Sequence, residues 1–211
     1  MSDIIEQGSA EWFEARLGLV TASQLTAVMS KGRGSAPSAT RATYMAQLIA
    51  ERLSGSPTEG FNSAAMQHGT DTEPQARAAY AMNRGQIVEE VGFVVHPIIK
   101  DSGASPDGMV GDNGLVEIKC PLTKTHLETL KTGRAPTTYI KQMQWQMACT
   151  GRHWCDFVSF DPRMPSNMRI KIIRVERDNA LIAEMEAEVF NFIADMHSEI
   201  QALIEMYGKA A

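Results

Sequence analysis

The sequence predicts a mixed α/β protein, in which helices flank a central mixed β-sheet and residues 1–211 form a single domain. The order of periodicities is the first observation behind this. Helical patterns occupy residues 9–83 and 125–150, strand patterns lie at 87–119 and 155–175, and a long helical pattern closes the chain. The length is the second observation, because 211 residues suffice for one domain with a sizeable core.

The first part of the chain is predicted to be helical. A short helix is expected over residues 9–16. Thr21, Ser23 and Gln24 fit a capping box, which predicts a second helix from about Ala22 to Met29. A basic Gly/Ser-rich loop over 31–38 precedes a helix over 38–53. Residues 63–83 again show a helical pattern, and Pro74 allows an interruption there because proline removes a helix hydrogen bond.

The second part alternates strands and helices. Residues 87–96 are expected to form one strand, followed by a hairpin over 105–119. Pro121 lies just after the hairpin and prevents further pairing, because proline has no N–H to donate. Helices are predicted over 125–131 and 137–150, and strands over 155–160 and 169–175. The final helix, over 178–207, has an apolar stripe at three-four spacing. That stripe covers the core in the simplest interpretation, and a subunit interface is the alternative.

The hairpin over 105–119 is the most informative feature. Asn113-Gly114 is a strong hairpin signal because both residues tolerate positive φ. Folding the hairpin brings Asp107 alongside Glu117, and Glu117 and Lys119 share a face because they are two apart in a strand. Two carboxylates and an ammonium group therefore converge on one patch.

Oxygen ligands of this kind suit Mg²⁺, which takes one or two carboxylates, keeps several waters and binds substrate phosphates. A lysine beside them can position or help to deprotonate a water, so the trio predicts metal-assisted phosphodiester hydrolysis. The alternative is that Asp107 caps a turn and that Glu117 and Lys119 lie on a solvated edge strand. The apolar residues around Glu117 favour the catalytic interpretation, because a strand covered on both faces makes unpaired charges unfavourable.

A second group of polar residues lies near the start of the chain. Arg16 shortly precedes the predicted helix start at Thr21 and Ser23. Free N–H groups at a helix start, two hydroxyls and a guanidinium are suited to binding a phosphate. An ordinary capped helix with Arg16 on the surface is the alternative at this stage.

Net charge and composition exclude few classes of function. The net charge of −5 neither indicates nor excludes a nucleic-acid binder, because a local basic channel can bind phosphates inside an acidic shell. No membrane-spanning stretch or signal peptide is recognised, and Cys120, Cys149 and Cys155 have no zinc-ligand spacing. We expect a cytoplasmic protein with reduced core thiols and no membrane association.

The two groups lie within segments in which nearly the whole chain resembles the lambda-type phage alkaline exonucleases. These belong to the YqaJ-like group of the PD-(D/E)xK nuclease superfamily, which has a restriction-endonuclease-like fold. The resemblance rests on five segments in a fixed order, at residues 16–23, 69–77, 105–121, 142–144 and 160–163.

The resemblance implies a role for each residue of the predicted catalytic group. Asp107, Glu117 and the backbone carbonyl of Ile118 would bind Mg²⁺, for which Mn²⁺ would substitute. Lys119 would orient and activate the attacking water. Glu73 matches an acidic residue near the metal, and Gln142 matches an active-site glutamine that could hold a water or the lysine.

The resemblance also implies a binding site for the DNA end. Arg16 and Ser23 would bind the 5′-phosphate, with Thr21 and Ser105 nearby, and Met66 would be an apolar wedge that unstacks the terminal base pairs. Three further residues match positions of interest: His68 is interpreted as structural, Gln144 as supporting its helix and Lys124 as a basic residue facing DNA.

The resemblance finally implies a processive 5′→3′ exonuclease that acts on linear double-stranded DNA. It would release 5′-mononucleotides and leave 3′ single-stranded tails for recombination in a bacterial host. A ring-shaped homotrimer and a single-strand annealing protein of the same phage or prophage are expected partners. Two alternatives remain open: an endonuclease that needs no free end, and a DNA-end-binding scaffold without catalysis.

Overall fold

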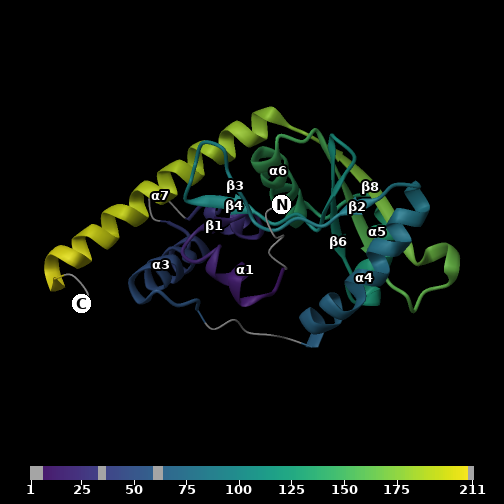
Figure 1. The fold of residues 1–211 in the computed structure, drawn as a ribbon, viewed down its shortest axis with the longest axis horizontal. Coiled ribbons are helices and arrows are strands. Elements are labelled where there is room, and N and C mark those ends of the chain that lie inside the picture. Colours follow the sequence, from purple (N-terminus) through teal and green to yellow (C-terminus); the bar gives the residue numbers. More distant parts are fainter. Residues whose placement is uncertain (1–6, 33–36, 59–63, 209–211) are drawn as a thin grey trace.

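The computed structural model describes residues 7–32, 37–58 and 64–208, and of residues 64–66 only the backbone. Its helices and strands are labelled in Figure 1. The helices are α1 (Ala10–Glu14), α2 (Leu25–Val28), α3 (Ala39–Ser54), α4 (Ala64–Arg84), α5 (Thr123–Thr132), α6 (Thr137–Thr150) and α7 (Asn179–Tyr207), with 3-10 turns at Ala22–Gln24 and Ser166–Met168. The strands are β1 (Val20–Thr21), β2 (Val88–Glu89), β3 (Val94–Val95), β4 (Ser102–Ala104), β5 (Gly108–Val110), β6 (Gly114–Lys119), β7 (Trp154–Phe160) and β8 (Ile170–Glu176).

The strands form two mixed sheets. The larger has the order β2-β5-β6-β7-β8, in which only β6 and β7 run parallel. The smaller has the order β1-β4-β3, in which β1 and β4 run parallel. The predicted mixed α/β fold with a central mixed sheet is therefore confirmed, and the short second sheet is an addition to it.

Strand β6 lies at the centre of the larger sheet and is buried on both faces, as its apolar sequence predicts. Val116 and Ile118 belong to a cluster with Ala76 and Tyr80 of α4. Leu115 faces the other way and packs with Met143 and Met147 of α6. The period of two along a strand thus sends even-numbered residues toward α4 and odd-numbered residues toward α6.

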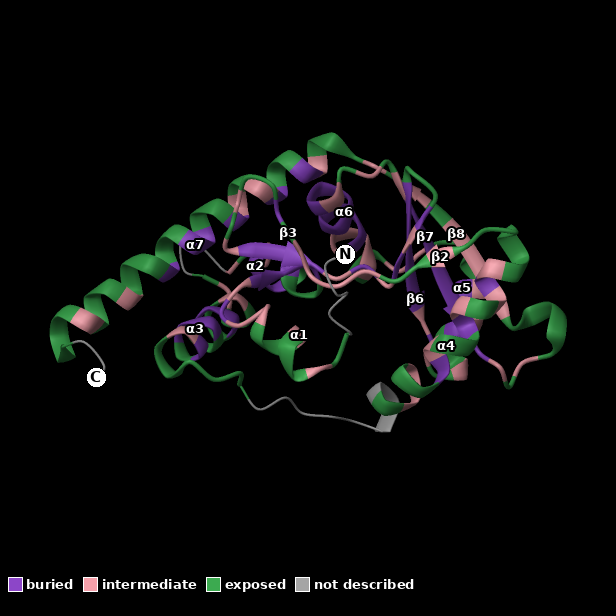
Figure 2. Ribbon diagram, in the orientation of Figure 1, coloured by how far each residue is buried: buried purple, intermediate pink, exposed green. Residues whose placement is uncertain are grey.

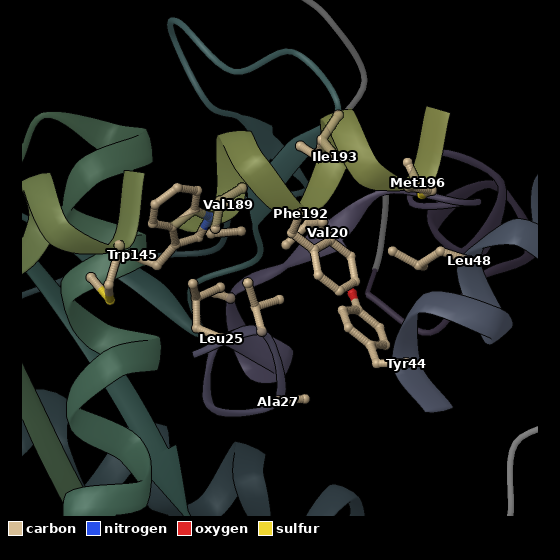
Figure 3. Close-up of a cluster of buried hydrophobic side chains, with 14 of the residues drawn as sticks. Val20, Leu25, Ala27, Tyr44, Leu48, Trp145, Val189, Phe192, Ile193 and Met196 are labelled. Carbon is tan, nitrogen blue, oxygen red and sulfur yellow. The ribbon is translucent and has the colours of Figure 1, made fainter. Parts of the chain in front are cut away.

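A second core joins the helices around the smaller sheet. Long helix α7 packs against α2, α3 and α6 and runs along one side of the molecule past α3 (Figure 1). In Figure 3 the ring of Tyr44 from α3 faces that of Phe192 from α7, and the two are stacked with centroids 5.7 Å apart. The inner face of α7 is buried and its outer face is exposed (Figure 2), so the apolar stripe covers the core over its first half.

The predicted strands need correction in one region. The expected strand over 87–96 is two short strands, β2 and β3, which belong to different sheets and are separated by Val91, Gly92 and neighbouring residues. The segment is divided because β2 pairs with β5 in the larger sheet, whereas β3 pairs with β4 in the smaller one. Strand β4, which pairs with both β1 and β3, has no counterpart among the predicted strands.

The hairpin has the predicted position but a different turn. The turn occupies residues 111–113, and it is Gly111 that adopts positive φ, at +52°, whereas Gly114 already lies in β6. Helix α4 also continues through Pro74 without interruption.

Cys120, Cys149 and Cys155 are buried free thiols, as predicted. Within the described parts of the chain, no helix is both long and apolar enough to cross a bilayer.

Candidate functional site

The predicted catalytic group comes together at the end of β6. Gly108 pairs with Val116 in the antiparallel β5–β6 ladder, so Asp107 lies opposite Glu117, one position further along. The Oδ2 atom of Asp107 accepts a hydrogen bond of 2.6 Å from the backbone N–H of Ile118. The hairpin therefore places the two carboxyl groups side by side, as the sequence indicates.

Glu117 is fully buried on the α6 face of the sheet, where three polar side chains contact its carboxylate. The Nζ atom of Lys119 lies 2.5 Å from Oε1, and the side-chain amide of Gln142 donates to the same oxygen at 2.6 Å. The amide of Gln146 donates to Oε2, also at 2.6 Å. Both oxygens are thus paired, which satisfies the requirement for a charged group in a closed core.

The electrostatic balance of the group is acidic. Burial raises the pKa of Asp107 well above its usual range, and the neighbouring Glu117 raises it further while Lys119 opposes both. Burial also raises the pKa of Glu73. Burial alone would lower the pKa of Lys119, but Glu117 and Asp107 raise it above the usual value. Asp107 and Glu117 therefore share the Lys119 ammonium group, and Glu73 is also paired with the Arg77 guanidinium.

Glu73 approaches this group from α4. It accepts a hydrogen bond of 2.7 Å from Arg77 one turn later, and it lines a cavity of about 450 Å³ with Ile118, Lys119 and Tyr139. Glu73 therefore shares a cavity with Lys119, and its role in catalysis stays a prediction. Tyr139, which the sequence analysis did not single out, lies with its ring centroid 5.2 Å from the Lys119 ammonium nitrogen.

The second predicted group lies on the other side of Asp107. A cavity of about 180 Å³ is lined by Arg16, Thr21, Ser23 and Ser105 together with Asp107 and Gln142, and by Gln7, Trp12 and Ala22. These residues come from α1 and the segments on either side of it, from β1, the following 3-10 turn, the β4–β5 connection and α6. Four residues matched to phosphate binding and two matched to catalysis therefore share one cavity.

The guanidinium of Arg16 is held by packing instead of by an ion pair. It lies 3.6 Å from the ring centroid of Trp12, whose indole N–H donates to the Ser105 hydroxyl at 3.0 Å. Among the described residues, Arg16 makes no salt bridge. Burial lowers its pKa to about 10, so it remains cationic at neutral pH.

The helical segment starts at Ala22 with Thr21 as its N-cap residue, as expected, but the capping box does not form. Thr21 makes no capping hydrogen bond; its hydroxyl lies 3.3 Å from that of Ser23, and its N–H donates to the Tyr44 hydroxyl. A 3-10 turn and a four-residue α2 follow. Because a helix dipole needs aligned turns, this short segment contributes less to phosphate binding than the sequence suggested. The hydroxyls and Arg16 remain as donors.

Several other matched residues are now placed. Gln144 is directed away from Glu117: it donates to the Glu176 carbonyl and accepts from the Asp178 N–H, both at 2.8 Å, so it connects α6 to the start of α7. His68 does not line the cavities described above; its Nδ1 lies 3.4 Å from the Thr72 hydroxyl. Lys124 is exposed on α5, and the Met66 side chain lies outside the described residues.

Gln146 is the partner of Glu117 that the sequence analysis missed. It follows Gln142 by four residues on a predicted helix, and residues spaced by four lie on one helix face. That spacing was the available signal, but the family resemblance pointed to Gln142 and Gln144 instead.

The residues present fit a divalent cation. No cluster of three or more His, Cys, Asp or Glu side chains with the arrangement of a metal site occurs in the described part of the chain. A Mg²⁺ site does not need one, since the ion takes one or two carboxylates and keeps waters. Burial first, and then the neighbouring carboxylate of Glu117, make a negative charge on Asp107 unfavourable, and a bound cation would relieve both effects.

A protein-family model matches more than half of the chain. Residues 11–153 match the model of the YqaJ-like viral recombinase domain. No curated protein matches the chain significantly.

Solved structures resemble the whole chain. The alkaline exonuclease of Laribacter hongkongensis, LHK-Exo, is 55% identical over 96% of this chain and 100% of its own, with a TM-score of 0.89, and it has also been solved in complex with dAMP. A phage-related exonuclease from Haemophilus somnus 129PT is 18% identical over 89% of this chain and 96% of its own, with a TM-score of 0.66, and it supports the fold alone. The chain therefore belongs to the YqaJ-like viral recombinase family, within the group of lambda-type alkaline exonucleases.

Proposed function

We propose that this nuclease is a Mg²⁺-dependent, processive 5′→3′ exonuclease of linear double-stranded DNA, and that Mn²⁺ substitutes for Mg²⁺. It releases 5′-mononucleotides and leaves 3′ single-stranded tails for recombination by strand annealing. The observation that carries this proposal is the cavity that joins Arg16, Ser23 and Ser105 to Asp107 and Gln142.

That shared cavity favours an enzyme that measures from the end of a strand. A phosphate held by the Arg16 guanidinium and the nearby hydroxyls would be a terminal one, because a cavity of about 180 Å³ leaves little room for a strand that continues on both sides of it. The catalytic carboxylates then lie at the next part of the same strand. Each cut produces a new 5′-phosphate, and its capture after the DNA advances biases movement forward.

Each residue of the site has a separate role in the proposed reaction. Asp107, Glu117 and the Ile118 carbonyl would hold the cation, which when bound polarises the scissile phosphate and lowers the pKa of water. Lys119 donates hydrogen bonds that orient the attacking water. Glu73 and Gln142 fix the positions of their neighbours at this site.

The relative from Laribacter hongkongensis supports the expected product. It has been solved with dAMP, a deoxynucleoside monophosphate. A 5′→3′ exonuclease of this kind would release nucleotides of that class one at a time.

Assembly is part of the proposal. A ring-shaped homotrimer would thread the duplex and provide processivity without high affinity in each subunit. A single-strand annealing protein from the same phage or prophage would receive the 3′ tail. The ring predicts a mass near three chains in solution, and a monomer under the conditions of catalysis would contradict it.

The deciding experiment compares three substrates: a linear duplex with 5′-phosphate ends, one with 5′-hydroxyl ends and a covalently closed circle. We expect Mg²⁺-dependent nucleotide release that is fast from the phosphorylated duplex, slower from the hydroxylated one, absent from the circle and abolished by EDTA. Cutting of the circle would indicate an endonuclease. DNA binding without release would indicate a scaffold.

A further inference from the structure

We propose that Gln146 is a positioning residue, which holds Glu117 in the orientation that binds the divalent cation and thereby sets the affinity of the site for that cation. The inference rests on the proposed function, because it takes Glu117 to be a metal ligand. It adds to the site a residue that acts only through Glu117.

The two glutamines of α6 differ in what surrounds them. Gln142 is partly exposed and lines the cavity at the proposed phosphate site, so water or substrate can replace its hydrogen bond to Oε1 of Glu117. Gln146 and Glu117 are both fully buried. Their 2.6 Å hydrogen bond to Oε2 therefore has no solvent competitor, and it persists while the other contacts of Glu117 change.

The chemistry of an amide suits this task. A carboxylate only accepts hydrogen bonds, so Gln146 must present its NH₂ group to Glu117. A lysine or arginine at this position would add a second cation and compete with the metal ion, and a carboxylate would repel Glu117. A neutral donor fixes the carboxylate and leaves its charge available.

The other end of the same amide indicates that Gln146 is placed for its contact with Glu117. Its Oε1 is buried and has no hydrogen-bond partner among the described residues, which is unfavourable for folding. The neighbouring Met143 and Met147 fill equivalent buried space without that penalty. The hydrogen bond to Glu117 is the one contact of the Gln146 side chain that requires a polar residue.

Gln144 provides a matched control. It is also a buried glutamine of α6, but both ends of its amide are used, at Glu176 and Asp178, and neither contacts Glu117. Replacing it disturbs the same helix and removes a similar volume of polar side chain. It should therefore reproduce any effect that comes from folding alone.

The experiment compares Gln146→Met, Gln144→Met and the wild type of the full chain. Each is titrated with Mg²⁺ and Mn²⁺ by calorimetry without DNA, and its thermal unfolding is followed in EDTA. We expect Gln146→Met to bind both ions about 10- to 100-fold more weakly. Nucleotide release should recover at high metal concentration, and the preference for 5′-phosphate ends should be unchanged. Gln144→Met should unfold at a lower temperature and bind metal as the wild type does.

Equal metal affinity in Gln146→Met and the wild type would overturn this inference alone, as would an equal loss in Gln144→Met. A wild type that neither binds nor requires a divalent cation would overturn the proposed function and this inference with it. Should Gln146→Met not fold, Gln146→Asn makes the same test, because asparagine keeps the amide but is one methylene too short to reach Glu117. It is expected to weaken metal binding in the same direction.

Discussion

Replacing Arg16 by alanine should reduce the preference for 5′-phosphorylated ends more than it reduces the chemical step. Arg16 is the one cationic side chain that lines the cavity of about 180 Å³. It lies on the Trp12 ring and has no salt bridge among the described residues. A phosphate would therefore be its ionic partner.

The structure sets the scale of the loss. Hydrogen bonds to charged groups contribute about 1.5–3 kcal/mol, which corresponds to roughly a 10- to 150-fold change in the ratio of rates. The loss of the contact with Trp12 should lower the free energy of unfolding by only about 0.5–1 kcal/mol. The effect on the phosphate preference should thus exceed any effect on folding.

The assay measures kcat/KM for otherwise identical duplexes with 5′-phosphate or 5′-hydroxyl ends. Arg16→Ala should bring the two values together by lowering only the first. Arg41→Ala is the control, because Arg41 also lies over an aromatic ring, that of Phe192, but outside both cavities and in a salt bridge with Asp195. An unchanged ratio in Arg16→Ala, or an equal fall in Arg41→Ala, would refute the phosphate role.

Three further predictions concern catalysis and stability. Lys119→Ala should abolish nucleotide release while leaving DNA affinity nearly intact, as measured by release and by fluorescence anisotropy on the same duplex. Gly114→Ala should destabilise the protein by about 1–3 kcal/mol in denaturant unfolding, because a Cβ there would lie 2.1 Å from the Trp154 ring. Asp161→Asn should lower stability at neutral pH but not in acid. Its hydrogen bonds from Arg163 hold the pKa of Asp161 well below the usual range, so its contribution is present above the unfolded pKa and is lost as pH falls.

Each of these has a contrary outcome. Substantial release by Lys119→Ala would mean that another group activates the water. Gly69→Ala, where a Cβ meets nothing within 4 Å, should be neutral or stabilising, and an equal loss there would remove the steric argument at Gly114. A stability difference between Asp161→Asn and the wild type that does not shrink as pH falls from 7 to 2 would remove the charge of Asp161 as its cause.

Hydrophobic periodicity and the residues at helix ends were sufficient to predict most of the longer helices and strands. The period of 3.6 and the end signals located α3, α6 and α7 to within one or two residues, because each helix buries one face and has a recognisable start or end. The hairpin that holds Asp107 and Glu117 was also predictable, since a short turn between two strands fixes their register. The catalytic group followed from that register.

Short elements were not predictable in the same way. Residues 87–96 favour extended backbone, but no local signal tells which partner each half pairs with, and two different strands divide the segment between two sheets. Thr21, Ser23 and Gln24 have the residue types of a capping box, and the helical segment does start after Thr21, but the Thr21 hydroxyl lies against that of Ser23 and the first turn is a 3-10 turn. Tertiary contacts outweighed propensity where an element was only a few residues long.

The sequence by itself determined the chemical groups and the hairpin that joins two of them, because neighbours in a chain meet by local geometry. Only the tertiary structure decided that Arg16 shares a cavity with Asp107, about ninety residues away, and that Gln146 instead of Gln144 contacts Glu117. Those contacts depend on how α1 and α6 pack against the sheet. Packing of distant elements is set by the whole core, so no short stretch of sequence contains it.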